Sequence, residues 1–144
     1  LALGDLSRDT FLQVMNRPAR YISRKALNKD PIDFKDLRRY YMKEKQYWMI
    51  DRLSDFESDI NTIKKMTPMA AICYIRKDIG YDDFLKEKAE SLSQKPDDWF
   101  ETLDEIEQSA AGIGSLYEWK SFVEGYDEQM SKHRQNKRNE KKAL

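Results

Sequence analysis

The chain has 144 residues, and its 26 basic and 26 acidic side chains cancel to a formal net charge of zero. A chain of this length is one domain by size and can bury a core without a metal ion or disulfides. Its single cysteine, Cys73, excludes a disulfide framework, and no apolar run reaches the length of a membrane span. These features predict a soluble protein of a reducing compartment, the cytoplasm.

Charge is distributed unevenly along the chain. Residues 8–45 carry eleven basic and five acidic side chains, residues 51–131 nine basic and nineteen acidic ones, and residues 132–144 six basic and one acidic. The order is therefore basic, acidic, basic. An anionic polymer such as DNA would bind the first block or the last and be repelled by the middle.

The spacing of apolar residues predicts an all-α protein, because they recur at three and four positions and only five Gly and four Pro interrupt them. We expect an irregular multi-helix bundle of about six to eight helices, with a helix-hairpin-helix-like bend near the N-terminus. A first helix should run from an Asp5 or Ser7 cap to about Met15, and a short helical turn should follow Ser23. Later helices are expected over residues 34–43, 44–65, 68–79, 82–92, 96–111 and 116–130.

Several of these expected helices carry a start signal. Asp33 is a good N-cap for one helix, a Thr-Pro pair at 67–68 begins another, and Ser115 with Glu118 forms a capping box for the last. The helix over 44–65 has the longest uninterrupted apolar pattern. Nothing in the sequence separates it from the helix before it, so the two could be continuous.

Burial is expected to follow the apolar faces of these helices. The helix over 44–65 should bury Tyr47 and Trp48, and the almost entirely apolar helix over 68–79 should lie at the centre of the core with Cys73 buried. Beyond Met130 the polar sequence should fray or be disordered. The apolar face of the last helix, which should also be buried, consists of Leu116, Trp119, Phe122, Val123 and Tyr126.

Residues 11–27 contain the most distinctive arrangement of charge. An apolar helix stops at the Asn-Arg-Pro sequence of residues 16–18, and Ser23 opens a second helical turn. The bend between them carries cations and no carboxylate, and cations at a helix N-terminus can bind phosphate oxygens. The alternative is a solvated basic turn between two core helices. The four cations are Arg17, Arg20, Arg24 and Lys25.

The sequence FLQVMNRPARYIS, residues 11–23, closely resembles the opening of 2B, the inserted and mobile subdomain of bacterial DNA helicases of the UvrD, PcrA and Rep group. That family typically has an apolar helix, then Asn-x-Pro-Lys-Arg-Gly-Ile-Gly, then another helix. Here Ala19 stands in place of Lys, and Tyr21 and Ser23 stand in place of the two Gly, which permit close approach of backbone to DNA phosphate. CYIRKDIGYDDFLKEKAE, residues 73–90, looks like the family's later helix pair. The positions that match the first motif are Asn16, Pro18, Arg20 and Ile22.

The resemblance implies an accessory subdomain of a UvrD-like ATP-dependent DNA helicase. Residues 1–134 would form the helical 2B-like subdomain, with residues 1–4 ending a helix of the preceding motor subdomain, and residues 135–144 would be a basic linker back to the motor. The subdomain would contact duplex DNA ahead of the fork and swing between open and closed arrangements. ATP and magnesium would bind the parent helicase, so the fragment alone would be no enzyme and would need no cofactor. The expected DNA-binding residues are Arg17, Arg20, Tyr21, Ser23, Arg24, Lys25, Arg38 and Arg39.

Two other classes of function stay open. The acidic surface of the last three helices could dock a repair or replication protein. A freestanding helical enzyme would need a perturbed acid or base, and the sequence offers no candidate pair, since His133 lies in the polar tail and no Walker loop is present. His133 and Cys73 alone do not make a metal site. The sequence Gly112-Ile113-Gly114 mimics a DNA-binding hairpin but lies between acidic helices, so we expect it to end a helix.

Overall fold

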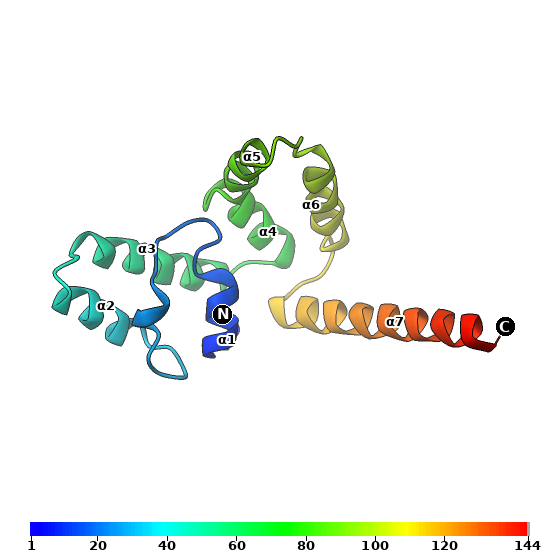
Figure 1. Ribbon diagram of the computed structural model, residues 1–144, viewed down its shortest axis with the longest axis horizontal. Helices are drawn as coiled ribbons and strands as arrows, with labels where there is room; N and C mark the ends of the chain where they lie inside the picture. Colours follow the sequence, from blue (N-terminus) through cyan, green and yellow to red (C-terminus); the bar gives the residue numbers. More distant parts are fainter. Residues whose placement is uncertain (144) are drawn as a thin grey trace.

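The computed structural model describes residues 1–143. Within that range the chain forms seven α-helices and one short 3-10 turn, with no strand, which confirms the predicted all-α class (Figure 1). None of the described helices is both long enough and apolar enough to cross a membrane. The elements are α1 (Arg8–Val14), η1 (Arg24–Ala26), α2 (Phe34–Lys43), α3 (Trp48–Ile63), α4 (Pro68–Lys77), α5 (Tyr81–Ser91), α6 (Asp97–Ser109) and α7 (Leu116–Ala143).

Four of the helices begin at caps that the sequence predicts. In each of them the side-chain oxygen of the cap accepts a hydrogen bond from a backbone N–H of the first turn. That bond satisfies one of the donors that a helix N-terminus leaves without an intrahelical partner. The capping residues are Ser7, Asp33, Thr67 and Ser115.

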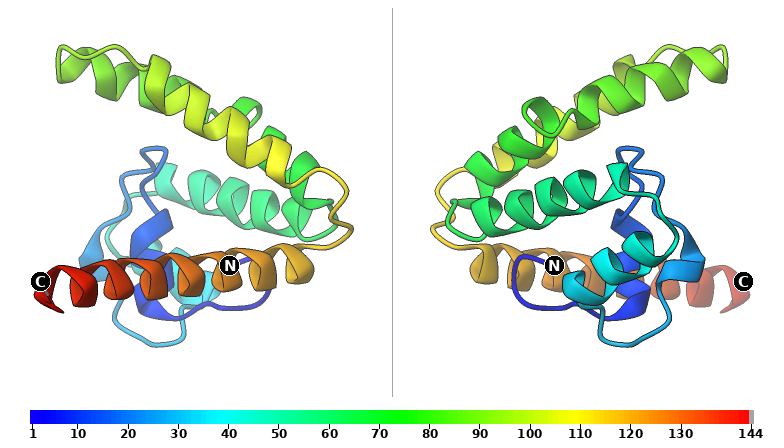
Figure 2. Two further views of the ribbon diagram at one scale, coloured as in Figure 1. Left: turned by 90° about the vertical axis from the view of Figure 1, so that its right-hand side faces the viewer. Right: turned by 90° about the vertical axis from the view of Figure 1, so that its left-hand side faces the viewer.

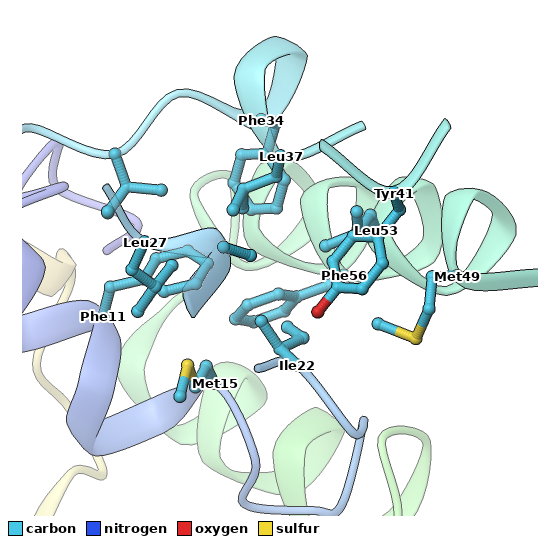
Figure 3. Close-up of a cluster of buried hydrophobic side chains, with 12 residues drawn as sticks. Phe11, Met15, Ile22, Leu27, Phe34, Leu37, Tyr41, Met49, Leu53 and Phe56 are labelled. Atoms are coloured by element: carbon cyan, nitrogen blue, oxygen red, sulfur yellow. The ribbon is translucent and has the colours of Figure 1, made fainter. Parts of the chain in front are cut away.

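The main hydrophobic core lies among α1, η1, α2 and α3. The rings of Phe11, Phe34 and Phe56 meet at its centre, with centroids between 5.5 and 5.7 Å apart in tilted or edge-to-face arrangements. Figure 3 shows Met15 and Ile22, from the two sides of the bend that follows α1, beside Phe56 in the same cluster. The bend is therefore part of the core structure. The other buried members are Ala26, Leu27, Ile32, Leu37, Tyr41, Met49 and Leu53.

A turn separates α2 from α3, which settles the question of whether they are one helix. Lys45 has a φ of +59°, its N–H donates to the carbonyl of Met42, and the N–H of Gln46 donates to the carbonyl of Tyr41. These two bonds form a Schellman motif, which usually places Gly at the left-handed position. Because Lys fills that position here, the sequence gives no recognisable signal for the end of α2. Helix α3 begins only at Trp48 and is therefore shorter than predicted.

The predicted burial of Tyr47 and Trp48 is wrong. Tyr47 is 60% exposed and Trp48 is 53% exposed. Both residues follow directly after the turn at Lys45, and α3 begins only at Trp48. The buried face of α3 starts one residue later, at Met49, and continues through Leu53.

Helices α4, α5 and α6 form a second layer on the side of α3 opposite to α1 and α2 (Figure 2). Arg76 of α4 is 6% exposed and connects the three helices. Its guanidinium lies 3.0 Å from the carboxylate of Asp82 in α5, 2.7 Å from Asp104 and 3.7 Å from Glu107 in α6. An ion cluster therefore connects the three helices, in addition to the buried apolar side chains of Ala71, Leu85 and Ala89.

Two expectations about α4 are wrong. The helix does not lie at the centre of the core, because the large buried cluster belongs to α1–α3 and the buried positions of α4 are Pro68, Ala71 and Arg76. Cys73 is exposed. It lies two residues after Ala71, which places it on the other side of the helix from the buried positions.

Helix α7 differs most from expectation. It runs to Ala143, so the predicted fraying beyond Met130 is wrong for the described residues, and the expected boundary between residues 134 and 135 falls inside the helix. Figure 1 shows α7 extending away from the other helices. It buries none of its side chains, and Phe122 and Tyr126 are 50% and 56% exposed. The predicted burial of its apolar face is therefore wrong for Phe122, Val123 and Tyr126, whereas Leu116 and Trp119 are half-buried.

Candidate nucleic-acid interface

The bend that follows α1, residues 16–25, is called the elbow from here on. Asn16 closes it with a reciprocal pair of hydrogen bonds. The side-chain Nδ2 of Asn16 donates to the carbonyl of Ile22 at 2.9 Å, and the backbone N–H of Ile22 donates to Oδ1 of Asn16 at 2.9 Å. The amide thus pairs with the backbone of Ile22 as another peptide group would. Because Ile22 is 3% exposed, the same contact fixes the elbow to the core.

We expect Asn16→Ala to destabilise the fold by about 2 kcal/mol, because it removes both hydrogen bonds and leaves partly buried N–H and carbonyl groups of Ile22 without partners. Urea unfolding followed by circular dichroism would measure the change. Asn61→Ala, at an exposed position late in α3, is the matched control and should change the free energy of unfolding by less than about 0.5 kcal/mol. Equal effects of the two substitutions would contradict this role for Asn16.

Arg20 holds the elbow against the end of α1. Its Nη1 donates to the carbonyls of Val14 and Met15, both at 3.2 Å, and its guanidinium carbon lies 4.1 Å from the centroid of the Phe56 ring. Burial lowers the pKa of the Arg20 guanidinium, and the carboxylate of Asp59 acts in the opposite direction. A cation placed at free C-terminal carbonyls is favourable. The contacts of Arg20 are therefore directed into the protein.

Three other cations of the elbow point to solvent. The side chains of Arg17, Arg24 and Lys25 are exposed. Within residues 1–143 none of them forms an ion pair with a carboxylate. Arg24 and Lys25 lie in η1, whose cap Ser23 accepts a hydrogen bond from the N–H of Lys25 at 3.2 Å. Among the described residues, these three cations of the elbow therefore carry positive charge that no ion pair neutralises.

Arg38 and Arg39 of α2, also expected at the interface, have partners within the protein. Arg38 is half-buried, with Nη1 3.4 Å from the carboxylate of Glu57 in α3. The Nη1 of Arg39 lies 3.5 Å from Asp36, one turn earlier on α2. Exposed pairs of this kind are weak, so Arg39 remains able to exchange its partner, whereas Arg38 also connects α2 to α3.

Tyr21 and Ser23 occupy different environments within the elbow. Tyr21 is 67% exposed and has a φ of +62°, in the left-handed region that favours glycine. Ser23 is half-buried, and its backbone N–H donates to the hydroxyl of Tyr41 at 2.8 Å. Tyr41 therefore holds the second half of the elbow against α2, while Tyr21 extends into solvent.

Sequence reasoning missed two arginines that act at the elbow or beside it. The Nε of Arg8 donates to the carbonyl of Leu27 at 2.9 Å, which fastens the start of α1 to the residue after η1. The guanidinium carbon of Arg52, in α3, lies 5.1 Å from the ring centroids of both Tyr21 and Trp48. The spacing of four residues between Trp48 and Arg52 is the available signal in the sequence, but the expected burial of Trp48 obscures it.

The described residues offer no built metal site, because no three His, Cys, Asp or Glu side chains lie close enough together to hold an ion. In the N-terminal half, the elbow combines an inward-facing arginine with three exposed cations. Comparison of the chain with family models, with curated proteins and with solved structures finds no match to any of them.

Proposed function

We propose that this chain is a DNA-contacting accessory subdomain of a UvrD-like ATP-dependent DNA helicase, corresponding to the subdomain called 2B. In this proposal Arg17, Arg24 and Lys25 contact the phosphates of duplex DNA, and Arg39 extends the contact. The chain reads no sequence, because phosphate contacts carry no base information. ATP and magnesium belong to the motor subdomains of the parent protein, so the chain alone hydrolyses no ATP.

One observation carries the proposal. The residues shared with the helicase motif are the ones that shape the elbow: Asn16 and Ile22 close it, and Arg20 fixes it to α1. The cations at the intervening and following positions are exposed. A loop that binds the DNA backbone needs a defined shape and exposed positive charge, and the elbow has both.

The backbone of Tyr21 gives further support. The helicase motif has Gly at this position, and here the residue has a positive φ of +62° although it carries a side chain. A non-glycine residue held in this region costs about 1–2 kcal/mol. The elbow therefore keeps the backbone conformation suited to Gly while the residue itself has changed.

The test is a titration of fluorescently labelled duplex, followed by anisotropy at low salt. The triple variant Arg17→Glu, Arg24→Glu, Lys25→Glu should bind at least about tenfold more weakly, because three attractive interactions with phosphate become repulsive. The slope of log K against log salt concentration should also become shallower by about 0.9 for each phosphate that the variant no longer neutralises. Duplexes of different base composition should bind the wild-type chain equally.

A charge-matched variant makes the test specific to the elbow. Replacing Lys64, Lys65 and Lys95 by Glu changes the net charge by the same amount at positions outside the elbow. This control should retain most of the affinity. If both triple variants lose affinity equally, only net charge matters and the elbow is not the contact surface. Unchanged affinity in the elbow variant would reject the proposed residues.

The end of α7 is a second basic surface. Residues 132–143 carry six basic side chains and one acidic one, and all are exposed. They would add affinity for any polyanion without orienting it. The elbow differs because the backbone that carries its cations belongs to a closed loop. The elbow variant described above removes this charge and leaves the basic end of α7 unchanged, so the titration distinguishes the two surfaces.

A protein-docking role is the second candidate, favoured by the groove between α6 and α7. Ile106, Phe122 and Tyr126 line it and are exposed, and α6 carries six acidic side chains and no basic one. A fitting partner would present a basic amphipathic helix. A synthetic Lys/Leu amphipathic peptide should bind the chain in calorimetry, and Ile106→Glu should abolish that heat without changing duplex binding.

A further inference from the structure

Tyr21, Trp48 and Arg52 form an exposed aromatic cluster where the elbow meets the first turn of α3. The guanidinium carbon of Arg52 lies 5.1 Å from each ring centroid, so the cation is held by both rings. Tyr21 is 67% exposed and Trp48 is 53% exposed. Figure 2 shows the elbow beside the N-terminal end of α3, where Trp48 begins the helix. The rings thus keep open surface beside the cations of the elbow.

Packing alone does not account for this cluster. The core beneath it is complete without these rings, since Met49 and Ile22, their neighbours in sequence, supply the buried side chains. Arg52 forms no ion pair within residues 1–143, although Asp51 and Asp55 lie on the same helix. An aromatic pair that holds a guanidinium in place and leaves ring surface exposed has the composition of a base-stacking platform.

We propose that this cluster stacks an unpaired nucleobase, with Tyr21 and Trp48 as the platform and Arg52 as the group that fixes the rings. The proposal rests on the proposed function, because the neighbouring phosphates are held by Arg17, Arg24 and Lys25. The ligand class it specifies is a nucleic acid with a junction, in which a duplex meets a single strand. Stacking accepts any base, so the site remains indifferent to sequence.

The experiment compares three labelled DNAs with the same duplex: one with flush ends, one with a short unpaired tail, and one whose tail keeps its phosphates but lacks bases. The natural tail should increase affinity about tenfold over the flush duplex, because stacking of one base has that magnitude. The abasic tail should add at most the small electrostatic gain of its phosphates. Equal binding of the natural and abasic tails would overturn the stacking proposal.

Variants locate the effect. Trp48→Ala should remove the gain from the natural tail while binding of the flush duplex stays within about twofold, since the indole ring contributes no charge. Tyr21→Ala should also remove the gain. Tyr117→Ala, which removes a ring that is 72% exposed on α7, should keep the gain. Trp48 lies outside the elbow, so Trp48→Ala tests the stacking site even if Tyr21→Ala changes the conformation of the loop. A tail gain that survives Trp48→Ala and Tyr21→Ala also overturns the proposal.

The outcomes separate this inference from the proposed function. Flush duplex binding that depends on the elbow cations, with no base-dependent gain, leaves the proposed function intact and rejects the stacking site. Base-dependent binding of the tail without measurable binding of the flush duplex supports the stacking site and rejects duplex contact. Absence of both rejects both.

Discussion

Replacing Arg76 by Met should destabilise the layer of α4, α5 and α6 by about 3–5 kcal/mol, because it removes the main partner of the buried Asp82 carboxylate. Asp82, which is 8% exposed, would keep only its ion pair with Lys77, and Asp104 would lose its 2.7 Å ion pair with Arg76. Urea unfolding and hydrogen exchange of the α5 and α6 amides would measure the loss. Lys86→Met is the control, since its 3.9 Å pair with Asp83 is exposed, and it should change stability by less than about 0.5 kcal/mol.

The Arg76 effect should also depend on pH. Burial would raise the pKa of the Asp82 carboxyl, but hydrogen bonds and charge from Arg76 and Lys77 hold that pKa below its ordinary value. A carboxyl with a lowered pKa in the folded chain stabilises it above a pH of about 4, and that contribution is lost as the pH falls through the folded pKa. In Arg76→Met the charged carboxylate becomes a cost that protonation relieves. The difference in stability between the two proteins should therefore shrink from pH 7 toward pH 3, and a constant difference would contradict the role of the ion cluster.

Phe11→Ala should cost about 3–5 kcal/mol, the usual range for removing a fully buried aromatic ring. Phe11 is 0% exposed and packs on both Phe34 and Phe56, whose rings would face the resulting cavity. The midpoint of chemical unfolding measures this loss. Val14→Ala, on the same helix at a position 37% exposed, should cost less than about 1 kcal/mol.

The Phe11 substitution also bears on the elbow. The core cluster contains residues from both sides of the elbow, Met15 and Ile22, together with Phe11 and Phe56. Loosening this cluster should therefore weaken duplex binding at temperatures where the protein is still folded. Unchanged binding under those conditions would show that the elbow holds its shape independently of the core.

The helix starts could be predicted because their signals are local. Asp33, Thr67 and Ser115 cap the helices that the sequence assigns to them, since a cap satisfies donors only two or three residues away. The end of α2 could not be predicted, because Lys45 occupies a left-handed position that usually takes Gly. The prediction of burial was wrong for Cys73 and for most of the apolar face of α7. An apolar stripe indicates that a face can be buried but not which element covers it.

The position of the cationic elbow could be predicted from the sequence, but the orientations of its side chains could not. Charge counting places Arg17, Arg20, Arg24 and Lys25 together, and the structure brings all four into one loop. Their orientations could not be read from the sequence: Arg20 turns inward because the free carbonyls at the end of α1 and the ring of Phe56 lie beside it. Arg52 was missed because it lies in an acidic part of the chain and meets Tyr21 only through the tertiary fold.

The central claim is that the outward cations of the elbow bind the phosphates of duplex DNA, while Arg20 only shapes the loop. The most direct measurement is a nuclear magnetic resonance titration that follows the side-chain Nε–Hε signals of the arginines as a short duplex is added. The signals of Arg17 and Arg24 should shift and saturate together, and the signal of Arg76 should not move. Shifts confined to Arg134 and Arg138, near the end of α7, would place the DNA on the other basic surface and contradict the account.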